Sequence, residues 1–202
     1  MEAINSAVTV RERILNVAAR LFVSEGYHGI SMREIAQAAG VSKAGLYYHF
    51  QDKEALFLGV LTANLERVEH IIEMSREQAG STRERITRFV QGIFALPPEQ
   101  RAIIRLATQE ISHLQPETQR AFARLYQRKF VDQIEVVFEE GVEAGELRPV
   151  NPRVATWALL GMLYPLLYPV HERYISSDPT VLEQMLDIFF SGILAEGTLD
   201  MD

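Results

Sequence analysis

Residues 40–50 of the chain read GVSKAGLYYHF. This stretch contains a glycine, a serine and a lysine, followed by two adjacent tyrosines and a histidine. A short helix in an acidic protein has little structural need for so many hydrogen-bonding side chains. The stretch therefore raises the question of what its polar residues face, namely Lys43, Tyr47, Tyr48 and His49.

The hydrophobic pattern predicts that this stretch forms a short helix with one buried face. Ser42 is a preferred N-cap residue, and Val41 and Leu46 take the two positions of a hydrophobic staple. These two residues are therefore expected to point into the protein, together with Phe50. The remaining face, which no core requires, carries Lys43, Ala44, Tyr47 and Tyr48.

The residues before this helix predict a helix-turn-helix. Ser31 and Glu34 have the spacing of a capping box, and Gly40 is expected to stop the helix that they open. An earlier helix is predicted to start at Thr9 and to end at Gly26, and Asp52 is expected to cap the helix after Phe50. A helix, a tight turn containing glycine and a short second helix make up the helix-turn-helix arrangement.

The rest of the chain also predicts helices, because apolar residues recur at spacings of three and four and no strand-like alternation occurs. One long helix is expected from Pro116 to Gly141 or Gly145. Further helix starts are indicated at Ser81, Pro98, Asn151–Pro152 and Asp178–Pro179. The predicted fold class is all-α. An N-terminal three-helix bundle is expected in residues 1–56, and a larger helical domain in residues 57–202.

The charge is distributed unevenly along the 202 residues, whose net charge is −7. Residues 1–56 contain six Lys or Arg and six Asp or Glu, whereas residues 57–202 contain fourteen and twenty-one. The acidity therefore belongs to the second part, and phosphate contact at the N-terminal end is permitted. The chain has no cysteine, which excludes disulfides and thiolate metal sites.

The longest uncharged run is residues 154–170, VATWALLGMLYPLLYPV. It is short for a membrane span, and Pro165 and Pro169 are expected to kink or end its helix. The N-terminus has no basic-then-apolar signal pattern. We therefore expect a cytoplasmic protein that does not insert into a membrane.

The exposed face of the helix after Ser42 has the chemistry of a major-groove contact. Ala44 and Gly45 allow the backbone to come close to a duplex, and Lys43 can reach a guanine edge or a phosphate. A tyrosine hydroxyl can donate to a phosphate oxygen. Free N–H groups at helix starts attract phosphate, which gives anchoring roles to Ser31, Ser42 and Lys53. The alternative is that the tyrosines lie at the edge of the core and that Lys43 is merely solvated.

Residues 31–56, SMREIAQAAGVSKAGLYYHFQDKEAL, resemble the DNA-binding signature of the TetR family of transcriptional regulators. The matching pattern is a hydroxyl residue, then I-A, A-G-V-S, G-x-x-Y-x-H-F and K-E-x-L. Ser31 stands where threonine is commoner, which keeps the hydroxyl. By resemblance, the positions that contact operator DNA are Ser31, Arg33, Lys43, Ala44, Gly45, Tyr47, Tyr48, His49 and Lys53.

The resemblance also implies that the chain forms a homodimer and responds to a small-molecule effector. The dimer would form through two C-terminal helices at about 152–172 and 179–195. The last helix has an apolar stripe that a partner could cover in part, formed by Leu182, Met185, Leu186, Phe189, Phe190 and Ile193. The alternative for this stripe is simple core packing.

An effector pocket is expected among the middle helices, where polar or aromatic residues interrupt apolar surfaces. The candidates are Arg105, Gln109, His113, Tyr126, Phe130, Trp157, Met162 and Tyr164. Each of these could instead be a core or surface residue. The apolar balance favours a hydrophobic effector, such as a fatty-acyl or aromatic compound. The implied mechanism is a population shift, in which the ligand favours a spacing of the two DNA-binding domains that no longer fits the operator, and so releases a repressor.

Other functions are less well supported by the sequence. GVSKAG is one residue off a nucleophile elbow and has no preceding strand, the five histidines lack metal-ligand spacing, and no Gly-rich phosphate loop occurs. We therefore expect no enzyme activity, no cofactor and no metal. A helical protein-binding adaptor with a degenerate helix-turn-helix remains as an alternative. Such an adaptor would be expected to replace Lys43, Tyr47 or Lys53, and all three are present.

Overall fold

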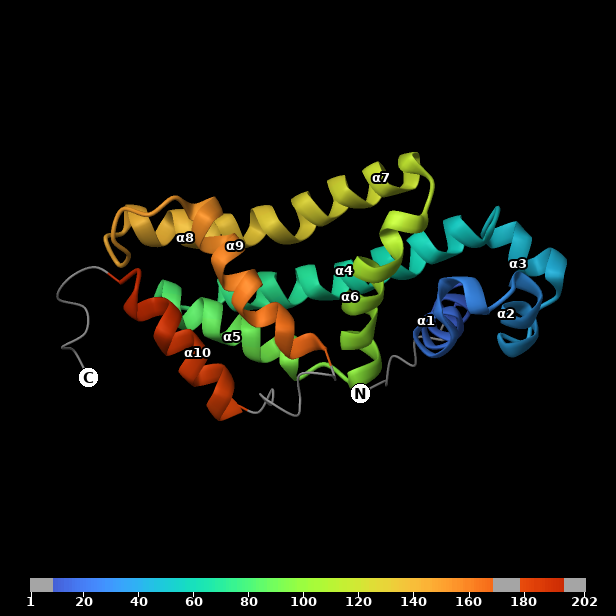
Figure 1. Cartoon of the computed structure of the whole chain (residues 1–202), viewed down its shortest axis with the longest axis horizontal. Coiled ribbons are helices and arrows are strands. Elements are labelled where there is room, and N and C mark those ends of the chain that lie inside the picture. Colours follow the sequence, from blue (N-terminus) through green and yellow to red (C-terminus); the bar gives the residue numbers. More distant parts are fainter. Residues whose placement is uncertain (1–8, 169–178, 195–202) are drawn as a thin grey trace, which may run out of the picture. The chain divides into compact units, whose positions relative to one another are not determined.

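The computed structural model describes residues 9–168 and 179–194. These residues form helices and no strand, with one isolated bridge between Leu147 and Leu194. The prediction of an all-α fold is confirmed. In chain order the elements in Figure 1 are α1 (Val10–Gly29), α2 (Met32–Ala38), α3 (Lys43–His49), α4 (Lys53–Glu77), α5 (Thr82–Phe94), α6 (Pro98–Glu110), η1 (Ile111–His113), α7 (Pro116–Tyr126), η2 (Gln127–Val131), α8 (Asp132–Glu143), α9 (Pro152–Leu163), η3 (Tyr164–Leu167) and α10 (Pro179–Ser191).

The chain divides into two compact units. Among the described residues, unit 1 contains 9–64 and 102–122, and unit 2 contains the remainder. Unit 1 therefore holds α1 to α3 and the start of α4, joined by most of α6, η1 and the start of α7. The domain boundary expected after residue 56 falls inside α4, which continues without a break to Glu77.

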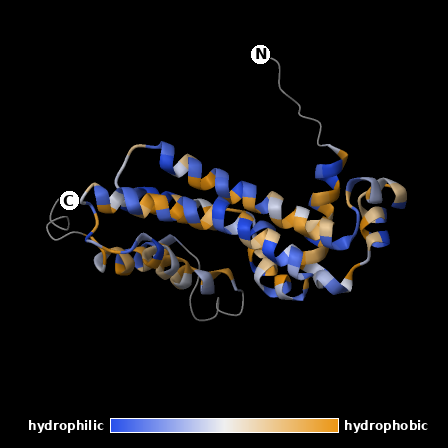
Figure 2. Ribbon diagram, turned by 90° about the horizontal axis from the view of Figure 1, so that it is seen from above, coloured by the Kyte–Doolittle hydropathy of each residue, from blue (hydrophilic) through white to orange (hydrophobic). Residues whose placement is uncertain are grey.

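The core of unit 1 is formed by one apolar face of each of its helices. The hydrophobic and hydrophilic residues that alternate along these helices in Figure 2 are the pattern of amphipathic helices. Phe22 of α1 and Phe57 of α4 are both fully buried, with ring centroids 5.1 Å apart in an edge-to-face arrangement. Each such aromatic side chain contributes about 1.5–3 kcal/mol through burial. This core fixes the helices that carry the stretch 40–50.

The predicted helix starts are confirmed at each capped position that the structure describes. Three capping boxes form, at Thr9–Glu12, Ser31–Glu34 and Ser81–Glu84. In each, the hydroxyl oxygen accepts from the backbone N–H three residues on, and the carboxylate accepts in return. Ser42, Asp52 and Asn151 accept from backbone N–H groups in the same manner. The expected cap at Asp178 lies outside the described residues.

The turn between α2 and α3 has the hydrogen bonds of a Schellman motif. Val41 N–H donates to Ala36 O at 3.0 Å, and Gly40 N–H donates to Gln37 O at 3.2 Å. Gly40 has a φ of 63°, a left-handed conformation that glycine adopts without steric cost. This local geometry sets the direction in which α3 leaves α2.

Unit 2 is built around α8, which packs against α5 and α9, while α10 packs against α5 and α9. The long helix expected from Pro116 to Gly141 or Gly145 is present from Pro116 to Glu143, because α7, η2 and α8 follow one another without a gap, but its geometry changes at η2. At η2 the Asp132 N–H donates to Gln127 O, five residues back, so the segment forms a π-helical turn. The Gln127 side chain also donates to Asp132 Oδ1 at 2.7 Å. Such a turn keeps the chain helical, and hydrophobic spacing alone does not reveal it.

The uncharged run behaves as expected where the structure describes it. α9 ends at Leu163, and Pro165 lies in the short η3 turn that follows. Pro169 lies outside the described residues. Within the described chain, no helix combines the length and the apolar character that a membrane span needs.

Candidate nucleic-acid interface

The exposed face of α3 carries the side chains that the sequence predicts. Tyr48 is 86% exposed and Tyr47 is 43% exposed. Lys43 and Ala44 are also exposed, whereas Leu46 is fully buried. Two large aromatic side chains therefore lie in solvent on a seven-residue helix, although burying them would be favourable. The alternative that both tyrosines are core-edge residues does not account for Tyr48.

The N-terminal end of α3 is held close to its cap. Ser42 Oγ accepts from the Gly45 N–H at 2.9 Å. A Cβ added at Gly45 would lie 3.2 Å from that Oγ, so any larger residue would press on the cap. The glycine thus keeps this end of the helix narrow, which a close approach to a duplex requires.

Two contacts between side chains order the polar face of α3. The Lys43 Nζ lies 5.8 Å from the centroid of the Tyr47 ring, within the range of a cation–π contact. The Tyr48 and His49 rings meet edge to face at 5.2 Å. These contacts limit the rotamers of residues that would otherwise be free, which lowers the entropic cost of binding.

The first turn of α4 holds a half-buried cation. The Lys53 Nζ lies 4.7 Å from the centroid of the Tyr27 ring. Burial lowers the pKa of Lys53, and the nearby carboxylates of Glu34 and Glu110 act in the opposite direction. Burial also raises the pKa of Tyr27, with Glu54 as the next contribution. Lys53 is therefore ordered by a ring and surrounded by acidic groups from other helices.

The start of α2 has one hydroxyl residue, Ser31, and one exposed cation, Arg33. Ser31 Oγ is 2.5 Å from Glu34 Oε2, and this hydrogen bond and the one from the Ser31 backbone lower the pKa of Glu34. The Ser31 hydroxyl proton is thus used within the capping box. Arg33 is exposed on the same turn.

All ten predicted DNA-contact residues belong to unit 1, on α2, α3, their caps and the first turn of α4. The sequence did not predict the contacts that these helices make with residues far away in the chain. Tyr27 N–H lies 3.5 Å from Glu110 Oε1, an interaction across 83 positions. Glu54 accepts from the Gln115 N–H at 2.7 Å. No local pattern could have indicated contacts between residues so far apart in the chain.

The eight candidate effector residues are divided between the two units. Arg105, Gln109 and His113 belong to unit 1, where Gln109 and His113 are exposed and Arg105 is half-buried. The His113 ring meets the His28 ring of α1 at 6.1 Å. The role of these three residues in effector binding stays a prediction.

Two of the candidates in unit 2 form an aromatic cluster at the π-helical turn. The Phe130 ring lies 5.1 Å from the Tyr126 ring and 6.1 Å from the Phe89 ring. Burial raises the pKa of Tyr126 to about 12, so its hydroxyl is neutral at physiological pH. It can therefore exchange hydrogen bonds with a ligand but cannot supply a charge. Next to this cluster, Lys129 forms a half-buried ion pair with Glu69 of α4.

The other three candidates lie on α9 and η3. Trp157 is 49% exposed, and Met162 and Tyr164 are half-buried. The hydroxyl oxygens of Tyr164 and Tyr168 are 3.0 Å apart. Asn64 of α4 was missed, although it is buried and its Oδ1 has no hydrogen-bond partner among the described residues. A single asparagine on a helix gives no sequence signal for this state.

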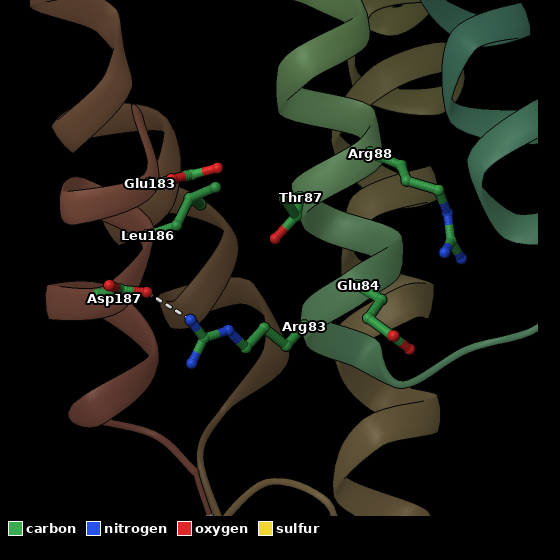
Figure 3. A pocket seen from close by; sticks show the side chains of 7 residues that line it. All are labelled: Arg83, Glu84, Thr87, Arg88, Glu183, Leu186 and Asp187. Atoms are coloured by element: carbon green, nitrogen blue, oxygen red, sulfur yellow. Dashed lines mark hydrogen bonds and ion pairs between the residues drawn. The ribbon is translucent and has the colours of Figure 1, made fainter. Parts of the chain in front are cut away.

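A pocket of about 430 Å³ lies in unit 2 between α5 and α10, and none of the eight candidates lines it. Figure 3 shows Arg83 of α5 extending to Asp187 of α10, with which it forms an ion pair, while Thr87 lies one turn further along α5. Arg88 extends away from α10 and donates to the carbonyl oxygens of Gln78 and Ala79. Arg83, Asp187 and Arg88 of this groove are thus engaged within the chain. No group of three metal-ligating side chains occurs in the part that the structure describes.

Two family models match most of the chain. Residues 14–60 match the family described as bacterial regulatory proteins, tetR family. Residues 79–166 match the tetracyclin repressor-like C-terminal domain. The first match contains α2, α3 and the polar face described above, and the second extends from the gap before α5 into η3.

Individual relatives are similar over nearly their whole length. The chain is 28% identical to the HTH-type transcriptional regulator QacR of Staphylococcus aureus, covering 92% of this chain and 99% of QacR. Among solved structures, the TetR family regulator PfmR of Thermus thermophilus is 29% identical with a TM-score of 0.71, covering 91% and 95% of the two chains. AibR in complex with isovaleryl coenzyme A and operator DNA is 28% identical with a TM-score of 0.70, covering 89% and 97%.

These matches agree with the geometry of unit 1. A helix-turn-helix with an exposed polar face on α3 occurs at the positions where the first family model matches, and helical units follow where the second one does. The chain belongs to the TetR family of transcriptional regulators.

Proposed function

We propose that this regulator binds operator DNA by inserting α3 into the major groove. The observation that carries this proposal is the exposed face of α3, with Tyr48 86% exposed on a helix that is anchored by the fully buried Leu46. Lys43 and Ala44 take the positions suited to base readout, because the first residues of a recognition helix meet base edges. Arg33 is the candidate for base contact from α2.

Phosphate contacts are proposed for residues that flank this helix. Tyr47 and His49 offer hydrogen-bond donors at the end of α3, and Lys53 offers an ordered cation at the start of α4. Ser31, Ser42, Gly45 and Tyr48 complete the proposed surface. The Ser31 hydroxyl proton is used in its capping box. The free backbone N–H groups at that helix start are therefore the better hydrogen-bond donors to a phosphate.

A homodimer is proposed through α9 and α10. The apolar stripe expected on α10 is largely used within the chain, since Leu182, Leu186, Phe190 and Ile193 are buried and Met185 and Phe189 are half-buried. A different apolar set remains in solvent, formed by Val154 and Trp157 of α9 and Ile188 of α10. This set, which we call the α9–α10 face, supports a partner surface better than the stripe does. Because Trp157 is exposed, a role in this partner surface is better supported than its predicted role in the effector pocket.

The effector is proposed to be a hydrophobic acyl or aromatic compound. The aromatic cluster of Tyr126, Phe130 and Phe89 supports this choice, as does the complex of the similar AibR with isovaleryl coenzyme A. Residues of α6 belong to the compact unit of α3, so a ligand that shifts α6 would disturb the DNA-binding helices and favour release.

No enzymatic role is proposed. The similar proteins QacR and PfmR are transcriptional regulators, and the polar residues of α3 face solvent instead of converging in a cavity. A protein-binding adaptor is the competing function, because an exposed tyrosine surface also suits a protein partner.

The test is selection of bound duplexes from sheared genomic DNA by the full chain at physiological salt. Enrichment of one palindrome is expected, because a symmetric dimer presents two copies of α3 to two half-sites. The genes beside the enriched sites would then suggest the chemical class of the effector. Folded protein that enriches no sequence would contradict the proposal and favour the adaptor.

A further inference from the structure

Arg11 lies in the first turn of α1, where it interacts electrostatically with the neighbouring Glu12 and lies over an aromatic ring. Its guanidinium carbon is 5.2 Å from the centroid of the Phe50 ring, and the residue is exposed. Within the described part of the chain, no carboxylate forms an ion pair with it. A cation near a helix N-terminus is also disfavoured by the helix dipole. Helix stability therefore does not account for this arginine.

The Phe50 ring fixes where the guanidinium lies. Phe50 is the C-cap of α3, 5% exposed, and its backbone N–H donates to Leu46 O at 3.0 Å. A Cβ added at Gly59 of α4 would lie 3.0 Å from the Phe50 ring and 3.2 Å from Leu15 of α1, so this region is tightly packed. The cation–π contact thus holds the charge of Arg11 beside the C-terminal end of α3.

That end of α3 is where the proposed phosphate contacts lie. Phe50 directly follows His49, and consecutive Cα atoms are about 3.8 Å apart. Arg11 therefore places a permanent charge over the ring of the residue that follows His49, at the end of α3 beside which the phosphodiester backbone would run. An arginine matches a phosphate with paired N–H donors, and its weak hydration suits a stacked, partly desolvated position.

We infer that Arg11 is a further phosphate contact, which extends the DNA-binding surface from α2, α3 and α4 onto the first turn of α1. The inference rests on the proposed function, since it requires α3 to meet a duplex. The partner is the phosphodiester backbone beside the bases that α3 contacts. This contact adds affinity for any sequence and does not select among bases.

The experiment measures binding of the full-length protein to a 30-base-pair random-sequence duplex by fluorescence anisotropy, as a function of NaCl concentration. Each phosphate contact contributes about 0.9 to the slope of log K against log salt. In a dimer, Arg11→Ala removes two contacts, so the slope should fall by about 1.8. At 100 mM salt, each lost contact weakens binding by about eightfold.

Arg13→Ala is the matched control. It removes the same charge from the same exposed helical turn, but Arg13 lies two positions on and therefore on another side of α1. Its slope should equal that of the wild type. Arg11→Lys retains a cation over Phe50 and should keep the slope while losing some affinity. Thermal unfolding of each variant separates loss of contact from loss of fold.

The outcomes separate this inference from the proposed function. A slope for Arg11→Ala that equals the Arg13→Ala slope, in a protein that binds the duplex, overturns the role of Arg11 alone. Wild-type protein that is folded and binds no duplex overturns both. A reduced slope in Arg11→Ala with an unchanged slope in Arg13→Ala supports the contact.

Discussion

Lys53 and Tyr47 are both proposed phosphate contacts, but they differ in charge. Their replacement should therefore change the salt dependence of DNA binding in different ways. Lys53 is a cation held over the Tyr27 ring, and Tyr47 contributes a neutral hydroxyl. Only a cation releases counterions from DNA. The same measurement of binding against salt should therefore distinguish the two roles.

For Lys53→Ala, the slope of log K against log salt should fall by about 1.8 for a dimer, whereas Tyr47→Phe should lower affinity with little change in slope. The loss for Tyr47→Phe should be about 0.5–1.5 kcal/mol per subunit, the net worth of one hydrogen bond. Anisotropy titrations on one duplex from 50 to 300 mM NaCl provide the measurement. A wild-type slope for Lys53→Ala would rule out the phosphate contact of Lys53, and an unchanged affinity for Tyr47→Phe would rule out that of Tyr47.

Lys43 belongs to the other class of contact, because it lies at the N-terminal end of α3. Lys43→Ala should change which sequences are bound, with discrimination at one base pair per half-site reduced by about 1–3 kcal/mol. Selection of duplexes by the variant, compared with the wild type, measures this. A uniform loss on all duplexes with unchanged preference would instead assign Lys43 to the phosphates.

At the scale of elements, local signals predicted the structure well. Thr9, Ser31 and Ser42 each interact with a residue three positions on, so the whole motif lies within a few letters of sequence. The outward direction of Tyr48 followed from the same local pattern, because burying Leu46 leaves the opposite face to solvent. Helix starts and the exposed face of α3 were therefore predictable.

Features that depend on distant residues were not predictable. The contact of Glu110 with Tyr27 and the ring of Phe50 under Arg11 join helices that sequence spacing cannot relate. The π-helical turn between α7 and α8 was not predicted, because hydrophobic spacing alone does not distinguish it from a continuous α-helix. On α10, spacing predicted which residues are apolar but could not show that Leu186 and Phe190 would be covered within the chain.

Two glycines offer a matched test of how the α2–α3 turn positions α3. Gly40 and Gly145 both follow a helix with positive φ, 63° and 74°, and a Cβ at either would meet nothing within 4 Å. Alanine at each should cost about 1–2 kcal/mol from backbone strain alone. For a chain of this size, the melting temperature should fall by roughly 2–8 °C in both variants.

The two variants should differ in DNA binding. Gly40→Ala strains the turn that orients α3, whereas Gly145→Ala strains a turn of unit 2 that carries none of the proposed DNA contacts. Operator affinity should therefore drop only for Gly40→Ala, measured at a temperature where both variants are folded. Equal losses would indicate that affinity follows general stability and that the turn has no special role.

At the scale of the whole molecule, DNA binding by a short helix depends on joining two copies. One α3 of seven residues reaches only a few base pairs, so a palindrome requires two subunits. Ile188 is 71% exposed, the most exposed residue of the α9–α10 face. Its burial by a partner would contribute about 1.5–3 kcal/mol per copy.

Ile188→Glu should therefore weaken the dimer by about 10²–10⁴-fold, since two copies are lost and each 1.4 kcal/mol is tenfold. Sedimentation at micromolar concentration should show a monomer, and binding to a palindromic duplex should be lost. Unfolding of the monomer should change by less than about 0.5 kcal/mol, because the side chain is exposed within one chain. Met74→Glu is the matched control: Met74 is a large hydrophobic residue of α4, 45% exposed and outside the α9–α10 face. If Met74→Glu dissociated the protein and Ile188→Glu did not, the dimer would have to form through α4 instead.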